Sequence, residues 1–376
     1  MRPLVIIDFS HTSGRMLYTA ISQTKPKKKN GKYITSHFLS YYKHLVFNSI
    51  QSTKQKFGGD VVLAMDSKGY WRKDFFSEYK GHRAKNKAKS EINFEEYYEE
   101  VNKIGDVIKE YFPFKVLKID KAEADDIAGV LSNAYGNTRQ IFLVTSDHDW
   151  KQVKAENKLV QMWDPIKREF QHLSGDEGDV LRTDFGNISK FTIKHALLGD
   201  VGDNVPCVTD NTVFSNEFIS YLKQNEIYTK CPIEFHKMSI SSELLNEYNI
   251  YKITKSGTNK GKETTEKNIY KNVPFGPKKA EKVTENNKTL NEFLKSNPLY
   301  ISNFERNLVL VDFDKIPQEI KEDIIDAFND TPVNYNYNAI LKYFVDEGLG
   351  QLVLESFKFA DSGDNIQRVS NLNDYL

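Results

Sequence analysis

Short apolar runs that end in acidic residues constrain the fold of this chain more than any other feature. Three of them are LVIID, which ends at Asp8, VVLAMD, which ends at Asp66, and IFLVTSDHD, which carries Asp147 and Asp149. Each run is short for a helix and rich in Val, Ile and Leu, as in buried strands of a parallel sheet. Segments with helical periodicity alternate with these runs, and this alternation predicts a doubly wound, mostly parallel α/β sheet.

The acidic residues that follow the strands are predicted to meet, because the carboxyl ends of parallel strands lie along one edge of a sheet. Glu123, Asp125 and Asp126 open a further helix in KAEADD, and Asp200 and Asp203 lie three residues apart in LLGDVGDNVP. Acidic residues at a helix start are favourable by themselves, which is the plainer explanation of KAEADD. However, nine carboxylates gathered without cations would repel one another, so the whole pattern predicts bound divalent metal.

Composition sets the outer bounds. The 376 residues suffice for one large α/β domain with an extension, or for two modest domains. Cys207 and Cys231 lack the spacing of a zinc site or of a disulfide framework, so a reducing, intracellular location is expected. We also expect a soluble, unprocessed protein, since there is neither a long apolar stretch nor a cleavable leader. With 52 basic and 52 acidic residues, global charge gives no support for nucleic-acid binding.

Local charge is more informative. Residues 70–90 hold seven Lys or Arg against two acids, and residues 250–282 hold nine Lys against three Glu. The first segment combines flat aromatic faces with cations, as single-strand-binding channels do. The alternative is a helix whose aromatic residues are core and whose lysines face solvent. Its place directly after a predicted metal-site strand favours the first interpretation. The candidates are Tyr70, Trp71, Arg72, Tyr79, Lys80 and Arg83.

Four other segments yield weaker predictions. The lysines of 25–32 lie between Pro and Gly, and we interpret them as a loop at the solvated surface rather than a nucleic-acid site. Residues 254–268 read as a mobile loop. In VPFGPKKAEKV, Gly276, Lys278 and Lys279 could form a phosphate cradle at a helix start. We interpret residues 301–376 as a helical lobe for packing or for binding partners, and we expect the last dozen residues to be poorly ordered. His148 is expected to point away from its acidic neighbours if its segment is extended.

In this order, IIDFS, AMDSKGYWR, EYKGHR, EADD, TSDHD and GDVGDNVP resemble the motifs of the 5′ nuclease family, which includes flap endonucleases and the nuclease domain of bacterial repair polymerases. Within it, SKGYWRKDF, NLVLVDFDKIP and ILKYFVDEGL are most similar to the ribonuclease H branch of T-even-type bacteriophages, over nearly the whole chain. The resemblance implies a PIN-like α/β 5′ nuclease fold with a mostly parallel sheet flanked by helices. It also implies a nuclease core at 1–190 with a helical arch near 70–100. Residues 191–376 would hold an interrupted helix-hairpin-helix element and a C-terminal helical lobe.

The resemblance also assigns site residues. The first magnesium ion would lie among Asp8, Asp66, Asp125, Asp126 and Asp147, and the second among Asp149, Asp200, Asp203 and Glu123. Tyr79, Lys80 and Arg83 match the base of the arch, where Lys80 would bind the scissile phosphate with Arg72 beside it. One departure concerns the hairpin: Cys207 stands where most relatives have Gly, and roughly 65 residues intervene before FGPKKAEKV, which indicates an insertion at about 207–272.

The implied activity is hydrolysis of phosphodiesters by two Mg²⁺ ions, which Mn²⁺ could replace, held about 4 Å apart. As a 5′-3′ exonuclease and flap endonuclease, the protein would cut RNA:DNA and DNA duplexes at 5′ ends and remove RNA primers in lagging-strand replication. A cytoplasmic monomer is expected, in the host cell if the chain is phage-encoded, with a single-stranded-DNA-binding protein or sliding clamp as possible partners. The alternatives are a PIN-type ribonuclease acting on single-stranded RNA and a non-catalytic, structure-specific binding protein with structural calcium.

Overall fold

The computed structural model describes residues 2–156, 159–210, 252–253, 263–264 and 275–360. Most of the predicted insertion at about 207–272, most of the predicted loop at 254–268 and the last dozen residues lie outside these ranges. Contacts divide the chain into two compact units. Unit 1 comprises Met1–Phe75, His82–Leu173 and Ile316–Leu376, and unit 2 comprises Phe76–Gly81 and Ser174–Lys315. The predicted boundary near residue 190, between a nuclease core and a helix-hairpin-helix region with a helical lobe, stays a prediction.

The central sheet of unit 1 confirms the predicted α/β architecture. Its six strands follow the order β5-β4-β1-β6-β7-β8. All neighbours pair in parallel except β7 and β8. Counted along the chain, this is the doubly wound order 3-2-1-4-5-6, whose direction of winding reverses beside β1. The strands are β1 (Leu4–Asp8), β4 (Asp60–Ala64), β5 (Phe114–Leu117), β6 (Ile141–Val144), β7 (Val160–Asp164) and β8 (Glu169–Gln171).

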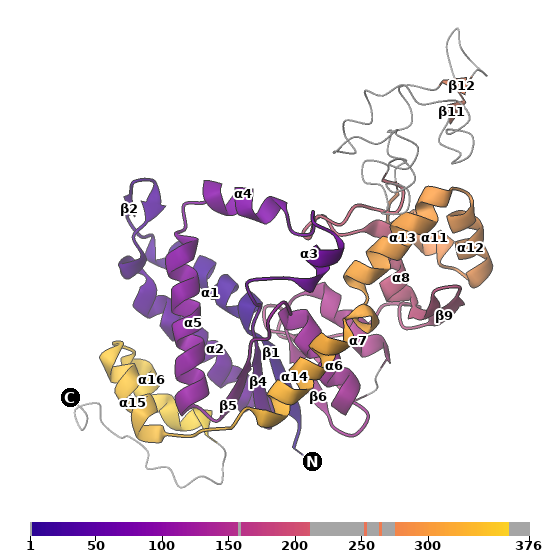
Figure 1. Ribbon diagram of the computed structural model, residues 1–376. Helices are drawn as coiled ribbons and strands as arrows, with labels where there is room; N and C mark the ends of the chain where they lie inside the picture. Colours follow the sequence, from indigo (N-terminus) through magenta and orange to yellow (C-terminus); the bar gives the residue numbers. More distant parts are fainter. Residues whose placement is uncertain (1, 157–158, 211–251, 254–262, 265–274, 361–376) are drawn as a thin grey trace. The chain divides into compact units, whose positions relative to one another are not determined.

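Helices cover both faces of this sheet (Figure 1). On one face lie α1, α2 and α5, which share a continuous apolar core with β1, β4 and β5. On the other face, α6 contacts β1, β4 and β6 and packs against α7 and α14. The bounds of these helices, and of the short 3₁₀ helix η1 that precedes α2, are α1 (Phe9–Thr24), η1 (Thr35–His37), α2 (Leu39–Phe57), α5 (Phe94–Tyr111), α6 (Ala124–Tyr135), α7 (Lys151–Glu156) and α14 (Gln318–Asp330).

One local prediction was wrong. The lysine-rich loop at 25–32 contains a β-hairpin of β2 (Lys28–Lys29) and β3 (Lys32–Tyr33). Asn30 and Gly31 form its two-residue turn with φ values of 52° and 76°, the left-handed pair that a tight hairpin turn requires. His148 opens the short 3₁₀ helix η2 (His148–Trp150), so the condition for its expected orientation, an extended segment, is not met.

The segment expected to form the arch contains two short helices. They are α3 (Trp71–Phe75) and α4 (His82–Lys89), and α4 lies near the start of α5 in Figure 1. No residue of α4 is buried, because its sequence HRAKNKAK contains no large apolar side chain. Lys85 and Lys89 of this helix are exposed to solvent, whereas Arg83 and Lys87 are half-buried.

The C-terminal region is helical, as predicted, and packs onto the core of unit 1. It consists of α15 (Tyr337–Asp346), α16 (Gly350–Glu355) and η5 (Ser356–Phe359). Phe359 is fully buried and packs edge-on against Phe112, with ring centroids 5.1 Å apart. Phe344 likewise packs edge-on against Phe47 at 5.2 Å. Of the two predicted roles for this region, the structure thus shows packing.

Unit 2 combines a β-hairpin with a group of helices. Helix α8 contacts both α11 and α13, so segments far apart in the sequence meet in this unit. Within the described ranges of both units, no helix is long and apolar enough to span a membrane. The elements are β9 (Val180–Thr183), β10 (Gly186–Ser189), α8 (Lys190–Leu198), β11 (Lys252–Ile253), β12 (Glu263–Thr264), α11 (Pro277–Val283), α12 (Asn287–Lys295), α13 (Pro298–Val311) and η4 (Phe313–Lys315).

The aromatic packing of the C-terminal region generates a stability prediction. Phe359→Ala should lower the free energy of unfolding by about 3–5 kcal/mol, because it removes a fully buried ring and leaves a cavity. Leu354→Ala is the matched control on α16, since Leu354 is 42% exposed. Urea unfolding followed by circular dichroism measures both. Equal effects of the two substitutions would show that the C-terminal region is not part of the core.

Candidate metal centre and its surroundings

Asp8 lies at the centre of the acidic edge of the sheet. It ends β1 and is only 3% exposed. Its carboxylate accepts hydrogen bonds from the backbone N–H of His11 and the hydroxyl of Thr145, both at 2.9 Å. Burial, and then the negative charge of Asp66, raises the pKa of Asp8 to about 7. A carboxyl in this state needs a proton or a cation beside it at neutral pH.

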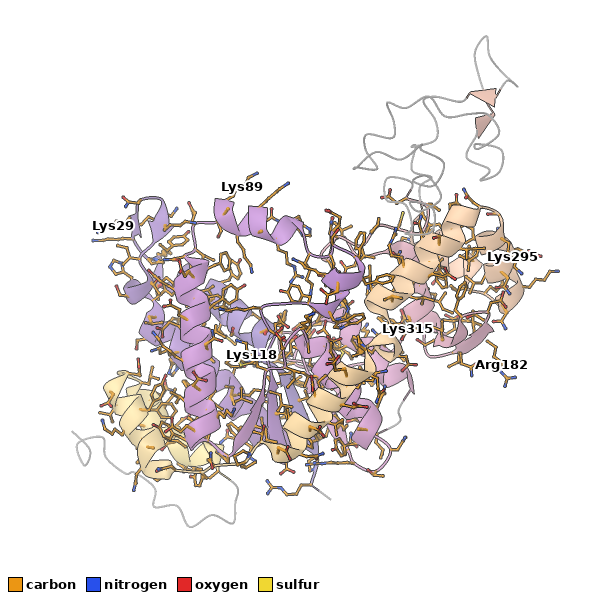
Figure 2. The ribbon with its side chains drawn as sticks, in the orientation of Figure 1. Lys29, Lys89, Lys118, Arg182, Lys295 and Lys315 are labelled. Atoms are coloured by element: carbon orange, nitrogen blue, oxygen red, sulfur yellow. The ribbon has the colours of Figure 1, made fainter. Side chains whose placement is uncertain are left out.

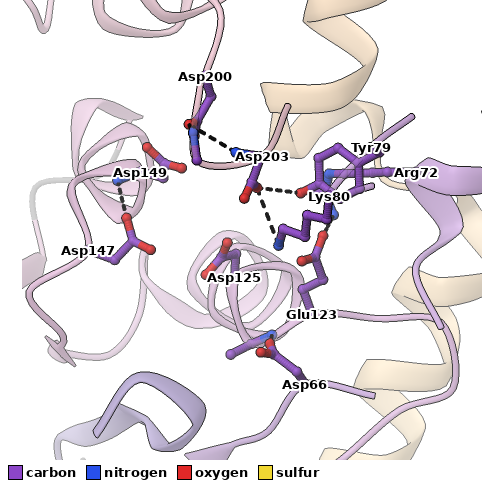
Figure 3. Close-up of polar contacts among 12 residues, drawn as sticks. Asp66, Arg72, Tyr79, Lys80, Glu123, Asp125, Asp147, Asp149, Asp200 and Asp203 are labelled. Atoms are coloured by element: carbon purple, nitrogen blue, oxygen red, sulfur yellow. Dashed lines mark hydrogen bonds and ion pairs between the residues drawn. The ribbon is translucent and has the colours of Figure 1, made fainter. Parts of the chain in front are cut away.

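Asp66 and Asp125 are linked through the start of α6. Asp66 follows β4, the strand paired with β1, and its carboxylate accepts the backbone N–H of Ala124 at 2.9 Å. Asp125 is the second residue of α6, where it lies beside the positive end of the helix dipole. Its carboxylate accepts a hydrogen bond from the indole of Trp150. Figure 3 shows Asp66 and Asp125 extending from these two elements.

Asp147 and Asp149 follow β6, the other neighbour of β1. The carboxylate of Asp147 caps η2 by accepting the backbone N–H of Asp149 at 3.0 Å. The backbone N–H of Asp147 in turn donates to Thr145 at 3.0 Å, and the same threonine hydroxyl donates to Asp8. Asp147 is close enough to raise the pKa of Asp8, as Asp66 does. Unit 1 therefore brings Asp8, Asp66 and Asp147 together. Asp125 follows Ala124, whose backbone N–H binds Asp66, and Asp149 lies on the same turn as Asp147.

Glu123 and Asp126 lie in a separate, buried arrangement with Arg72. Asp126 is fully buried and accepts both Arg72 guanidinium nitrogens, at 2.8 and 3.0 Å. It also accepts the indole N–H of Trp71 at 3.1 Å and the backbone N–H of Glu123 at 3.0 Å. Glu123 accepts Arg72 at 2.9 Å and caps α6. This cluster ties α3 to the start of α6, so Arg72 has a structural task that its predicted place beside a phosphate did not include.

These donor sets fit a hard divalent cation. Mg²⁺ prefers carboxylate oxygens and keeps several waters, and a group of four or five partly buried carboxylates offers such ligands. Burial and then the charges of Asp66 and Asp147 raise the pKa of Asp8, and a cation beside Asp8 would favour its charged form. Asp126 fits a cation less well, because protein donors already engage both its oxygens.

In unit 2, Asp203 binds the segment that carries Tyr79 and Lys80. The Tyr79 hydroxyl donates to the Asp203 carboxylate at 2.7 Å, and the Lys80 ammonium lies 3.3 Å from it (Figure 3). The Lys80 backbone N–H donates to the Asp203 carbonyl at 2.8 Å, and the Asn204 side chain donates to the Glu78 carbonyl at 2.8 Å. Lys80 is 7% exposed with a φ of 53°, so Asp203 holds it in an unusual backbone conformation.

Asp200 shapes the same loop. Its backbone exchanges two hydrogen bonds with Val205, and its carboxylate accepts the backbone N–H groups of Gly202 and Asp203 at 2.6 and 3.2 Å. A hydrogen bond from His195 holds the pKa of Asp200 below its usual value, and the loop amides act in the same direction. Gly199 has a φ of 69° and lies against the Val205 carbonyl, so a larger residue would clash.

Helix α13 fixes the chain beyond this loop through a polar stripe that sequence reasoning missed. Asn303 donates to the carbonyls of Val208 and Asp210 at 3.0 and 2.9 Å. Asn307 donates to the carbonyls of Ala196 and Pro206, both at 2.8 Å. The Arg306 guanidinium donates to both asparagines, and burial lowers its pKa to about 10. Only the spacing of the three polar residues within an apolar helix could have signalled this role.

The remaining predicted binding residues are more exposed. Arg83 is half-buried on α4. Gly276 precedes α11 without a side-chain cap, and Lys278 and Lys279 are exposed in its first turn. The Lys279 ammonium lies over the rings of Phe275 and Phe293. A phosphate cradle at this helix stays a prediction.

Comparisons with known proteins agree with the motif order. Residues 3–182 match the family model described as 5′-3′ exonuclease, N-terminal resolvase-like domain, and residues 278–359 match that of T4 RNase H, C terminal. The chain is 28% identical over 359 residues to a ribonuclease H of Enterobacteria phage T4, covering 93% of each protein.

Two similar solved structures come from bacteriophage T5. One is a 5′-exonuclease with bound zinc ions, at a TM-score of 0.46 and 18% identity, covering 88% of this chain and 100% of that one. The other is a flap endonuclease complex with DNA and metal ions, at a TM-score of 0.43 and 18% identity, covering 93% and 98%.

The state of Asp8 generates a prediction for the metal-free protein. Because its folded-state pKa of about 7 lies above the usual 3.8, wild-type stability in EDTA should fall as pH rises through this window. Asp8→Asn keeps one acceptor oxygen for the His11 backbone N–H, replaces the second oxygen by an amide that can donate to the Thr145 hydroxyl, and removes the charge. It should therefore raise Tm at pH 8 by several degrees, at about 2–4 °C per kcal/mol. Thermal unfolding at pH 4 and pH 8 measures this, and a Tm below wild type at pH 8 would contradict the account.

Arg72 generates a second prediction. Arg72→Met should lower the free energy of unfolding by about 3–5 kcal/mol, because it leaves the Glu123 and Asp126 carboxylates buried without their cation. The neighbouring Lys73 is exposed, so Lys73→Met is the control and should change stability little. Urea unfolding compares the two variants. A wild-type midpoint for Arg72→Met would rule out the structural role.

Proposed function

Because this chain belongs to the 5′ nuclease family, we propose that it is a divalent-metal-dependent nuclease that cleaves at 5′ ends as a 5′-3′ exonuclease and flap endonuclease. The observation that carries the proposal is the meeting of Asp8, Asp66, Asp125 and Asp147 at the carboxyl edge of the parallel sheet. Their mutual repulsion is relieved by a cation, and hydrolysis of phosphodiesters is the reaction that such a site supports.

In this proposal, Asp8, Asp66, Asp125 and Asp147 bind one Mg²⁺ ion and Asp149 contributes to a second. Bound Mg²⁺ would activate water and stabilise the charge on the leaving oxygen. The protein donors Thr145, Trp150 and the amides of α1 and α6 hold the carboxylates in place. As ligands, Asp200, Asp203, Glu123 and Asp126 stay predictions, and Mn²⁺ is the expected substitute ion.

Lys80 is the proposed contact to the scissile phosphate. Its ammonium is buried beside Asp203 and over the Tyr79 ring, at 5.0 Å from the ring centroid. A lysine held in this way keeps its charge in one place, which lowers the entropy lost when a phosphate binds. Arg72 would act through α3 and the start of α6, as a positioning residue.

The proposed substrates are RNA:DNA and DNA duplexes with 5′ ends or flaps. Support comes from the similarity to the phage T4 protein named ribonuclease H and from the 5′-3′ exonuclease domain. Removal of RNA primers during phage lagging-strand replication, in the host cytoplasm and as a monomer, follows as the biological role. A single-stranded-DNA-binding protein or a sliding clamp would be its partner.

A gel assay tests the activity directly. A 5′-labelled flap and a nicked RNA:DNA duplex are incubated with the protein in Mg²⁺ or in EDTA, and short 5′ products are expected only with Mg²⁺. Cleavage confined to single-stranded RNA would favour the PIN-type ribonuclease. Binding without cleavage in both conditions would favour a binding protein with structural calcium.

Asp149→Asn tests the metal assignment. The substitution should reduce cleavage by at least about 10²–10³-fold, because a bound metal ion contributes several kcal/mol to catalysis. Folding and duplex binding should be kept. Asp346→Asn is the control, because Asp346 is exposed on α15 and pairs with Lys342. If Asp149→Asn retains cleavage, the assignment of Asp149 as a metal ligand is wrong.

A further inference from the structure

The β2–β3 hairpin and α4 carry an excess of positive charge that the proposed catalytic centre does not use. Residues 25–33 contain five lysines and residues 82–89 contain three lysines and an arginine, without an acidic residue in either segment. We call residues 25–33 and 82–92 the α4–hairpin surface. Both parts belong to unit 1.

The hairpin is fastened to the chain that leaves α4. The Tyr33 backbone N–H donates to the Glu91 carbonyl at 2.8 Å, and the Lys28 ammonium binds the Glu91 carboxylate at 2.6 Å. The Lys32 ammonium donates to the carbonyls of Ser90 and Ile92. Since Ser90 directly follows the end of α4, the hairpin and the helix form one continuous piece of surface.

Lys28 and Lys32 thus serve the attachment, Lys87 lies half-buried over the Phe94 and Tyr98 rings, and the other five lysines are exposed. Lys28 is held by Glu91 and lies over the Tyr33 ring at 4.9 Å. Lys25, Lys27 and Lys29 are exposed on the hairpin, as are Lys85 and Lys89 on α4. Figure 2 shows Lys29 and Lys89 at the same outer end of unit 1, with Lys118 well away from them.

The position of these cations favours a polyanion as ligand. Like charges held close together repel, and a chain of phosphates relieves this repulsion while releasing its own counterions. The tight Asn30-Gly31 turn and the bonds to residues 90–92 fix the backbone that carries the lysines before any ligand binds, which reduces the ordering cost. A flexible lysine loop would lack this advantage.

We propose that the β2–β3 hairpin is a second phosphate-binding element, which holds the single-stranded 5′ flap beyond α4. The proposal rests on the proposed nuclease function and deepens it, since it assigns a binding site to the part of the substrate that is released. The hairpin contacts phosphates without reading bases, so the interaction is independent of sequence.

The test is a triple variant, Lys25→Gln, Lys27→Gln and Lys29→Gln, which leaves the attachment through Lys28 and Lys32 intact. The control is a triple variant of equal charge change on exposed lysines elsewhere in unit 1, Lys109→Gln, Lys118→Gln and Lys342→Gln. Fluorescence anisotropy in EDTA measures the affinity of each protein for duplexes with no flap, a short flap and a long flap, across a salt series.

The hairpin variant should bind the long flap roughly tenfold more weakly than wild type, and its log–log salt slope should be shallower by up to about 2, at ~0.7 per phosphate contact. Its binding and Mg²⁺-dependent cleavage of the duplex without a flap should be unchanged, as should its unfolding midpoint.

Equal weakening by the control variant would show that only total charge matters and would overturn the proposal. Unchanged long-flap binding, or equal weakening on the duplex without a flap, would overturn it as well. The proposed nuclease function fails separately, if the wild-type protein cleaves none of these substrates with Mg²⁺.

Discussion

The burial of Asp8, together with repulsion from Asp66 and Asp147 at one edge of a parallel sheet, is the constraint on which the site in unit 1 depends. The sheet places Asp8 between the strands that lead to Asp66 and Asp147, at the point where the winding reverses. Burial and these neighbours together raise the pKa of Asp8 to about 7. The fold accepts this unfavourable arrangement, as proteins do at functional sites, and a divalent cation is the simplest way to offset it.

Fixed protein donors keep the carboxylates in position against this repulsion. Thr145 joins Asp8 to Asp147 through one hydroxyl, and Trp150 holds Asp125 from the turn that follows β6. Arg72 holds Asp126 and Glu123, and so joins α3 to the start of α6. A change in α3 would therefore alter the geometry of Asp125, one residue from Asp126. In unit 2, Asp203 holds Tyr79 and Lys80 in a comparable way.

The sheet and the acidic edge could be predicted from sequence because both depend on local patterns: apolar runs of strand length, and an acid at the end of each. Partners separated by many residues could not. Nothing in the sequence pairs Trp150 with Asp125, or turns Arg72 inward to Asp126 instead of toward a phosphate. The Asn30-Gly31 turn was a readable signal, but the surrounding lysines favoured a loop over a hairpin. The attachment of that hairpin to residues 90–92 could be found only in the structure, because these segments are about 60 residues apart in the sequence.

Calorimetric titration of Mg²⁺ into the metal-free protein tests the central claim most directly. We expect saturable binding of two ions near neutral pH, with a measured heat that varies with the ionisation enthalpy of the buffer, because the buffer takes up the proton that Asp8 loses when the cation binds. Asp8→Asn should weaken the binding and remove the proton release. Absence of saturable binding, or binding that is the same in Asp8→Asn, would contradict the claim that this acidic edge is a metal centre.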